Sequence, residues 1–347
     1  MTTLGNDPSR PGGLPSPGTL DPDAVHRAGH PIRRIATALA MPEPMVALLL
    51  IVVFTWAALT VPHFLEIRKY LLPTSSLYME TGFMALAMTF VIIGGHIDLS
   101  CAGTLALVCT LVPWLNIHAH INIWVLAVAG LFMGTALGAF NGWLVAVLGL
   151  PSLVVTLGTM AAYRGLAQLL AGDRSLPVPG EFQGIDNFWI ANRVPVPLFM
   201  FLALALAAGI VLHKTIIGRW VYALGTNEQA ARYAGVPVRN TLIGLFAASG
   251  LLSALGGLTM ISRLGYARYD YAKGAELDVI TAVVLGGASI LGGRGTIIGT
   301  AMALFLIAIL QESMGVASVS TGFQKTASGA LLILAVLASN MMARLRR

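Results

Sequence analysis

The sequence carries very little charge for its length, and this scarcity decides the class of protein. Only 10% of its 347 residues are Asp, Glu, Lys or Arg, while 56% are hydrophobic; soluble domains carry roughly 25% charged residues. The apolar residues come in runs of about 17 to 25, long enough for helices to cross a bilayer. Strand-like alternation is lacking, so we predict an all-α integral membrane protein and exclude a soluble domain and a β-barrel.

The basic residues do not indicate a nucleic-acid-binding surface, although the formal net charge is +6. They cluster at the ends of apolar runs, where positive charge sets the orientation of a membrane protein. We therefore expect no nucleic-acid partner, and membrane lipid as the surroundings of most of the chain.

Cysteine is scarce as well, with two in the whole sequence. Cys101 and Cys109 share one apolar run, and a helix would separate them by about 12 Å along its axis, which prevents a disulfide between them. His118 and His120 lie in a stretch that reads as a short polar loop, and neither they nor the cysteines have the spacing of metal ligands. The sequence predicts no metal site.

Motifs for catalysis and nucleotide binding are also missing. None of the lysines follows a glycine, as the lysine of a phosphate-binding P-loop does. Neither His-Glu-x-x-His nor Gly-x-Ser-x-Gly occurs, so the patterns of a metalloprotease and of a serine hydrolase are lacking. We expect neither an enzyme nor a bound cofactor in this chain.

The beginning of the sequence differs from the rest. Residues 1–40 are rich in Pro, Gly, Ser and Asp, with too little apolar surface to fold, and we expect a disordered cytoplasmic tail. They lack the order of basic, apolar and small residues that marks a cleaved signal peptide. We expect residues 41–347 to form a transmembrane domain with one long cytoplasmic loop at 214–240.

About ten apolar windows predict transmembrane helices in this domain. The third and the eighth are short or interrupted by glycine, so each is either a full crossing or a re-entrant or broken element. An even number of crossings places both termini on the same side. The predicted helices are 45–62, 77–95, 99–117, 121–148, 151–171, 195–213, 241–262, 277–292, 295–313 and 325–343.

Basic residues orient this arrangement. Arg33 and Arg34 precede the first predicted helix, arginines follow the last, and loop 214–240 has several basic residues against Glu228 alone. Lys and Arg are enriched in cytoplasmic loops. We therefore expect both termini and this loop in the cytoplasm.

The most informative segment is a polar stretch between two long apolar runs, residues 225–237. Thr226 and Asn227 are candidate N-caps of a surface helix that stops at Gly235, before Pro237. Its alanines form a small face that another protein can approach closely, although a capped linker helix would show the same pattern. The candidate contact residues are Asn227, Glu228, Gln229, Ala230, Ala231, Arg232 and Gly235.

Two glycine-rich breaks interrupt the apolar runs. Both begin with Val-x-x-Gly-Gly, which hints at an internal repeat. Such glycines allow close helix packing or leave backbone groups free to line a pathway. Asp98 follows the first break, where it either caps the third helix or meets a solute or ion. The break residues are Gly94, Gly95, Gly286, Gly287, Gly292 and Gly293.

Few polar or aromatic side chains lie within the predicted helices, and these are candidates for a translocation path. Arg164 either extends to the membrane surface or lines a polar route. Aromatic faces beside amide and hydroxyl groups suit a neutral sugar, although this match is generic. The candidates are Asp98, Asn141, Trp143, Tyr163, Arg164 and Gln168.

Several motifs resemble the permease subunits of ribose-type carbohydrate ABC importers, in the branched-chain-amino-acid/ribose permease superfamily. The likeness runs from about residue 45 to the C-terminus, with the motifs in the family's order. His96 departs from it, because the family usually has glycine there. The motifs are Gly95-His96-Ile97-Asp98-Leu99-Ser100, Asn141-Gly142, the run from Leu150 to Met160, Arg164-Gly165-Leu166-Ala167, and the run from Gly274 to Gly295.

The resemblance implies an import function and a set of partners. They are a second permease, identical or related, cytoplasmic ATPase subunits that bind ATP and Mg, and a periplasmic or lipid-anchored sugar-binding protein. The segment 227–235 then resembles the coupling helix that docks on an ATPase, with Gln229 in place of the usual acid.

The implied substrate is a pentose, a deoxyhexose such as rhamnose, or autoinducer-2, moved across the bacterial inner membrane. An ion-coupled secondary transporter of a small polar solute is the alternative. It would need a coupling group inside the membrane, for which Asp98 and Arg164 are the candidates.

Overall fold

The structure, a computed structural model, describes most of the chain from residue 42 onward. The predicted tail 1–40 lies outside the described residues, and the predicted helix 325–343 is described only in part, with residues 326–331 helical. The described residues are 42–61, 64–66, 72–184, 188–190, 194–320, 322–324, 326–331, 333–334 and 337.

Seven helices of the described part are long and apolar enough to cross a membrane. Each matches one predicted helix to within about three residues at either end, which confirms an all-α, multi-pass membrane protein. They are α3 (Pro42–Thr60), α6 (Ser100–Ala119), α7 (Ile123–Leu148), α8 (Ser152–Ala171), α9 (Val196–Lys214), α12 (Val238–Leu264) and α14 (Ile297–Val316).

Two further predicted helices are shorter than a full crossing. They are α5 (Met79–Ile93), with 15 residues, and α13 (Ala275–Leu285), with 11. The eighth predicted helix is thus short, and of the two alternatives for the third the structure shows the long one, because α6 is continuous over 20 residues. The break falls before α6 instead, since Gly94 and Gly95 end the second helix, α5.

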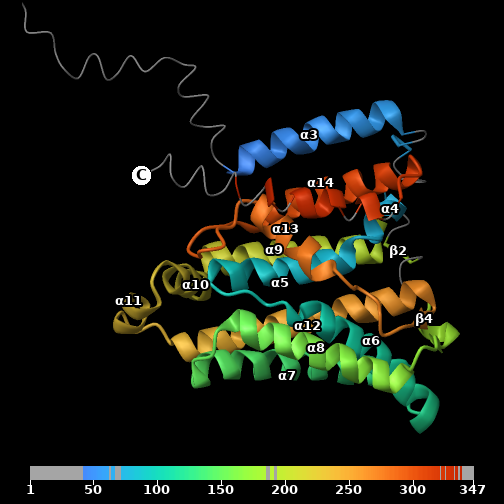
Figure 1. Cartoon of the computed structure of the whole chain (residues 1–347), viewed down its shortest axis with the longest axis horizontal. Coiled ribbons are helices and arrows are strands. Elements are labelled where there is room, and N and C mark those ends of the chain that lie inside the picture. Colours follow the sequence, from blue (N-terminus) through green and yellow to red (C-terminus); the bar gives the residue numbers. More distant parts are fainter. Residues whose placement is uncertain are drawn as a thin grey trace, which may run out of the picture. The chain divides into compact units, whose positions relative to one another are not determined.

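The short helices lie in the middle of the bundle. Figure 1 shows α3 and α14 on one side and α7 and α8 on the other, with α5, α13, α6 and α12 between them. Nearly all residues of α5 and most of α6 are buried. These helices are surrounded by protein and not by lipid. The backbone groups at the ends of a short helix can therefore find hydrogen-bond partners inside the domain.

Helices α7 and α12 pack closely against each other, and glycine makes this approach feasible. A Cβ atom on Gly138 would lie 2.1 Å from the carbonyl oxygen of Phe246, and one on Gly250 would lie 2.0 Å from that of Gly134. Any larger residue would push the helices apart. This is the small-residue packing that membrane helices use when lipid offers no hydrophobic driving force between them.

The two ends of the bundle carry different short elements. At one end, α10 (Ile216–Thr226) and α11 (Glu228–Tyr233) project from the helices. At the other end, β1 (Leu176–Pro177) pairs antiparallel with β4 (Tyr266–Ala267), and β2 (Trp189–Ile190) with β3 (Val194–Pro195). The 3-10 helix η2 (Gly180–Phe182) and α4 (Leu72–Ser76) belong to the same end. We call these the α11 end and the β4 end (Figure 1).

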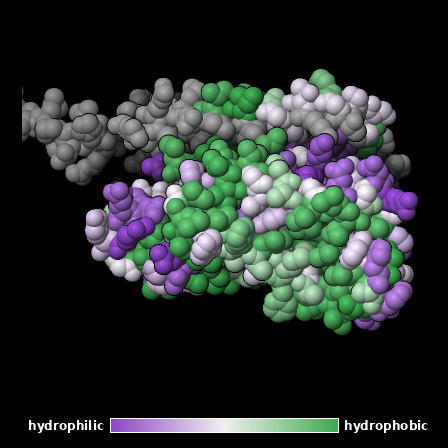
Figure 2. Space-filling model, turned by 60° about the horizontal axis from the view of Figure 1, so that its bottom comes forward, coloured by the Kyte–Doolittle hydropathy of each residue, from purple (hydrophilic) through white to green (hydrophobic). Residues whose placement is uncertain are grey.

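Between the two ends the surface is apolar. Figure 2 shows hydrophobic residues over the middle of the visible face and hydrophilic residues gathered at both ends. Large side chains such as Leu59 (81% exposed), Phe132 (73%) and Leu169 (83%) point outward. Such continuous apolar exposure is unfavourable in water and matches the lipid-facing belt of a membrane protein.

Candidate functional site

The polar segment at the α11 end forms the capped surface helix that its sequence predicts. The side-chain Oδ1 of Asn227 accepts a hydrogen bond from the N–H of Ala230 at 3.0 Å, which caps the first turn. Gly235 ends the helix with a left-handed φ of 82°, a backbone conformation that favours glycine. Arg232 and Glu228 pair with each other at 3.0 Å, so neither charge is free of a partner within the helix.

One face of α11 is anchored and the other is open. Ala231 is buried, and its carbonyl accepts a hydrogen bond from the N–H of Val236 at 3.0 Å. Gln229 and Ala230 are exposed, and Tyr233 is 92% exposed. An exposed Tyr beside small residues on an anchored helix is suited to a protein contact, because aromatic anchors contribute strongly to such interfaces.

The two glycine breaks end α5 and α13 in the same way. In each, the residue after the second glycine donates its N–H to a carbonyl five positions earlier, as in a Schellman motif. These bonds join His96 to Val91 at 3.0 Å and Ala288 to Val283 at 3.1 Å. The second glycines, with left-handed φ, are Gly95 (82°) and Gly287 (95°).

A chain of buried polar side chains follows the first break. Ser100 donates both its N–H and its hydroxyl to Asp98 Oδ1, at 2.9 and 2.5 Å, and Asn141 donates from Nδ2 to Ser100 Oγ at 2.8 Å. The hydroxyl of Tyr163 lies 3.4 Å from Asn141 Oδ1 and 3.3 Å from the carbonyl of Leu137. We call Asp98, Ser100, Asn141 and Tyr163 the buried polar chain.

This chain joins three elements that are distant in the sequence. Asp98 precedes α6, Ser100 begins it, Asn141 lies on α7 and Tyr163 on α8. All four residues are at most 5% exposed. Asp98 thus bonds the first turn of α6, one of the two roles its position suggested. Because each polar group has a partner, the chain fixes the start of α6 against α7 and α8.

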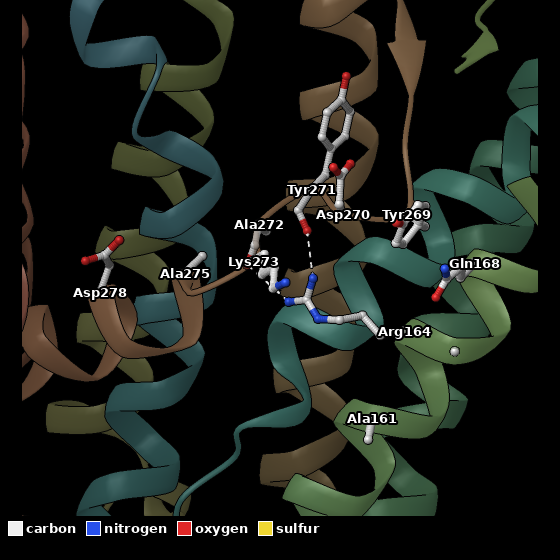
Figure 3. A pocket seen from close by; sticks show the side chains of 11 residues that line it. Ala161, Arg164, Gln168, Tyr269, Asp270, Tyr271, Ala272, Lys273, Ala275 and Asp278 are labelled. Atoms are coloured by element: carbon white, nitrogen blue, oxygen red, sulfur yellow. Dashed lines mark hydrogen bonds between the residues drawn. The ribbon is translucent and has the colours of Figure 1, made fainter. Parts of the chain in front are cut away.

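An open pocket of about 860 Å³ lies between α8 and the segment 269–278 that leads from β4 into α13. Figure 3 shows Arg164 reaching from α8 toward the backbone of this segment, with Gln168 one turn further along the same helix. The guanidinium donates to the carbonyls of Tyr271 and Ala272, both at 3.2 Å. The side chain therefore holds the segment against α8 while bordering the pocket.

The charges around the pocket are largely paired. Arg164 lies 3.6 Å from Glu276 Oε2, and Arg268 binds both carboxylate oxygens of Asp270 at 2.8 Å. The hydrogen bonds from Arg268 lower the pKa of Asp270 below its ordinary value. Lys273 and Asp278 also line the pocket. The lining thus offers hydrogen-bond donors and acceptors, and its positive and negative charges balance.

The six candidate path residues separate into three groups. Asp98, Asn141 and Tyr163 come together in the buried polar chain, while Arg164 and Gln168 border the pocket. The remaining candidate, Trp143, is 43% exposed on α7 and stacks on Phe140 with ring centroids 6.4 Å apart. It touches neither of these groups.

Several members of these sites had no signal of their own in the sequence. Ser100 lies inside one of the motifs described above, but one of its hydrogen bonds comes from Asn141 on α7, which lies 41 positions later in the sequence. The pocket residues Tyr269, Asp270 and Lys273 lie in a loop that looks charge-balanced and unremarkable. Their role emerges only when α8 is placed beside them.

Comparisons with known proteins agree on the class of this chain. A family model described as "Branched-chain amino acid transport system / permease component" matches residues 70–336. The chain belongs to this permease family. It is therefore the permease component of an ABC transporter and not itself an enzyme.

Similar proteins share most of their length with the permease. The "Autoinducer 2 import system permease protein LsrD" of Photorhabdus laumondii is 36% identical over 303 residues, which are 85% of this chain and 90% of that protein. Proteins of the same name from Escherichia coli and Shigella flexneri are 35% identical over 301 residues, covering 84% of this chain and 89% of theirs. No solved structure matches the permease.

Proposed function

We propose that the permease forms the membrane path of an ABC importer that carries a sugar or sugar-like solute into the cytoplasm. Relatives at 35% and 36% identity over most of the chain are named as autoinducer-2 import permeases, which is the observation that carries the proposal. Autoinducer-2 is the first substrate to test. A pentose or a deoxyhexose such as rhamnose follows, because these solutes share the cyclic polyol chemistry.

The ATPase partner docks on the exposed face of α11. Asn227 and Gly235 bound this helix, and Ala231 is buried on its inner side. A helix anchored in this way transmits displacement, whereas a flexible loop would absorb it. ATP and Mg bind to the ATPase subunits, and the permease contributes the surface between them and the membrane.

The solute passes on the side where α8 meets the segment 269–278. The pocket there presents Gln168, Lys273 and Asp278 beside the aromatic ring of Tyr269. Paired amide, charged and aromatic groups bind neutral polyols, because hydroxyl groups both donate and accept hydrogen bonds. The compensated charge is unsuited to a strongly anionic solute.

The orientation follows from the same assignment. The α11 end faces the cytoplasm, as do both termini, and the β4 end faces outward in the bacterial inner membrane. A periplasmic or lipid-anchored binding protein delivers solute to the β4 end. A second permease, identical or related, completes the path.

Uptake measurements test this proposal. Cells that lack their own importers, and that express the permease with its ATPase and binding protein, should take up labelled autoinducer-2, ribose or rhamnose. Uptake should stop when ATP is depleted and should persist when an ionophore collapses the ion gradients. The reverse pattern would contradict the proposal and establish an ion-coupled secondary transporter.

A further inference from the structure

Four glycines bring three backbone segments into direct contact near the α11 end. Gly225 lies in the last turn of α10, Gly95 in the first break, and Gly292 and Gly293 in the second. A Cβ atom on Gly225 would lie 1.8 Å from the carbonyl oxygen of Ile93 and 2.6 Å from the nitrogen of Gly293. We call these four glycines the glycine joint.

Hydrogen bonds hold the joint together. The N–H of Gly293 donates to the carbonyl of Ile93 at 2.8 Å, which links the two breaks directly. One turn before the joint on α10, the hydroxyl of Tyr222 donates to the carbonyl of Gly295 at 2.7 Å. The end of α10 is therefore bonded to the second break, which is bonded in turn to the last residue of α5, where the first break begins.

The joint lies between α11 and the buried polar chain. Asn227, the cap of α11, follows Gly225 by two positions. On the other side, the hydroxyl of Thr156 on α8 lies 3.3 Å from the carbonyl of Ile97, two positions after Gly95. Backbone contacts thus run from α11 to the first break, and the Thr156 side chain continues them to α8, which carries Arg164 at the pocket.

We propose that the glycine joint transmits the movement of α11 to both glycine breaks together and so couples ATP hydrolysis to opening of the path. This inference rests on the proposed importer function. The breaks are equivalent helix ends, and α5 packs against α13, so one displacement acts on both. Backbone segments in direct contact cannot move independently of each other, because no flexible side chain lies between them to absorb the movement.

Gly225→Ala in the complete transporter tests the joint. Gly225 has no left-handed φ, so the substitution acts through the clash with Ile93 and not through backbone strain. The matched control is Gly158→Ala on α8, where a Cβ would meet no atom within 4 Å. We expect normal ATPase binding and continued ATP hydrolysis in Gly225→Ala, with uptake per ATP reduced about tenfold or more.

Two results would overturn the inference. One is uptake in Gly225→Ala equal to that of the control. The other is loss of ATPase binding together with uptake, which would show that the contact merely supports the docking helix.

A second experiment remains decisive if Gly225→Ala does not accumulate in the membrane. A Cβ on Gly293 would lie 2.7 Å from Thr226 Oγ1, so Thr226→Ala should restore at least half of the coupling lost in Gly293→Ala. Gly149→Ala controls for backbone strain, because Gly149 has a similar φ of 69° and open space around it. Absence of rescue would contradict transmission through this contact.

The wild-type transporter separates this inference from the importer function. If the wild-type permease neither binds an ATPase nor supports uptake, the proposed function fails whatever the variants show. If the wild type works and the joint variants match their controls, only the glycine joint is refuted.

Discussion

After α5 and after α13 the chain forms equivalent capping hydrogen bonds, but the residues that follow differ in kind. The first break spans 94–99 and leads directly into α6, while the second spans 286–296 before α14 begins. Three positions after the second glycine, the first break has Asp98 and the second has Ile290. The same helix ending therefore leads to a buried carboxylate in one case and an apolar side chain in the other.

The two breaks also contact different parts of the bundle. The first break is tied by side chains to α7 and α8 through the buried polar chain. The second is tied by its backbone to α10, where Gly292 and Gly293 meet Gly225 and Thr226. The same helix ending is thus held by side chains in one copy and mainly by backbone contacts in the other.

The largest effect is expected at Asp98, which distinguishes the first break from the second. Asp98→Ala leaves the N–H and hydroxyl of Ser100 without their acceptor in a buried site, a loss of about 2 to 4 kcal/mol. We expect uptake to fall to background and the thermal midpoint of the purified permease to drop. Ser289→Ala in the second break is the control and should behave as wild type; equal losses in both would erase the distinction.

A smaller effect is expected at Asn141, the link between the first break and α7. Asn141→Ala removes the 2.8 Å hydrogen bond to Ser100 Oγ and leaves a small cavity, so we expect destabilisation of about 1 to 3 kcal/mol. Scanning fluorimetry of the purified permease measures this. A double mutant with Asp98→Ala should be less destabilised than the sum of the two, and strict additivity would show that the residues act independently.

The smallest effect is expected at Tyr163, the last member of the chain. Its hydroxyl makes only long contacts of 3.3 and 3.4 Å, so Tyr163→Phe should lower stability by less than about 1 kcal/mol. Uptake should stay within about twofold of wild type. An effect as large as that of Asn141→Ala would mean that the hydroxyl contacts the solute path and not only α7.

Helix positions were predictable because long apolar runs need few other constraints in a membrane. The seven long helices follow from such runs, and Asn227 with Gly235 marks the ends of α11. The sequence left open whether the third helix is a full crossing, because glycines near a helix boundary do not show on which side of it the helix is interrupted. Gly94 and Gly95 terminate α5 and leave α6 intact.

Contacts between distant helices were not predictable from the sequence alone. Glu80 on α5 and Arg263 on α12 form an ion pair at 3.0 Å with both side chains mostly buried, although neither stood out as a candidate. Gly225 stood out only as the first residue of the polar stretch 225–237, whereas its contact with Ile93 and Gly293 depends on the placement of three segments. Local patterns carry no such information.

We propose that α11 couples this permease to an ATPase. Gly235→Arg introduces a large cation at the end of the docking helix, where a Cβ would meet no atom within 4 Å but the left-handed φ of 82° strains any residue other than glycine. Gly149→Arg, at a glycine of similar φ with equally open surroundings, is the matched control. We would purify each from membranes and quantify the ATPase that accompanies it. The account predicts an ATPase bound to wild type and to Gly149→Arg and lost from Gly235→Arg; equal ATPase with all three, or none with any, would contradict it.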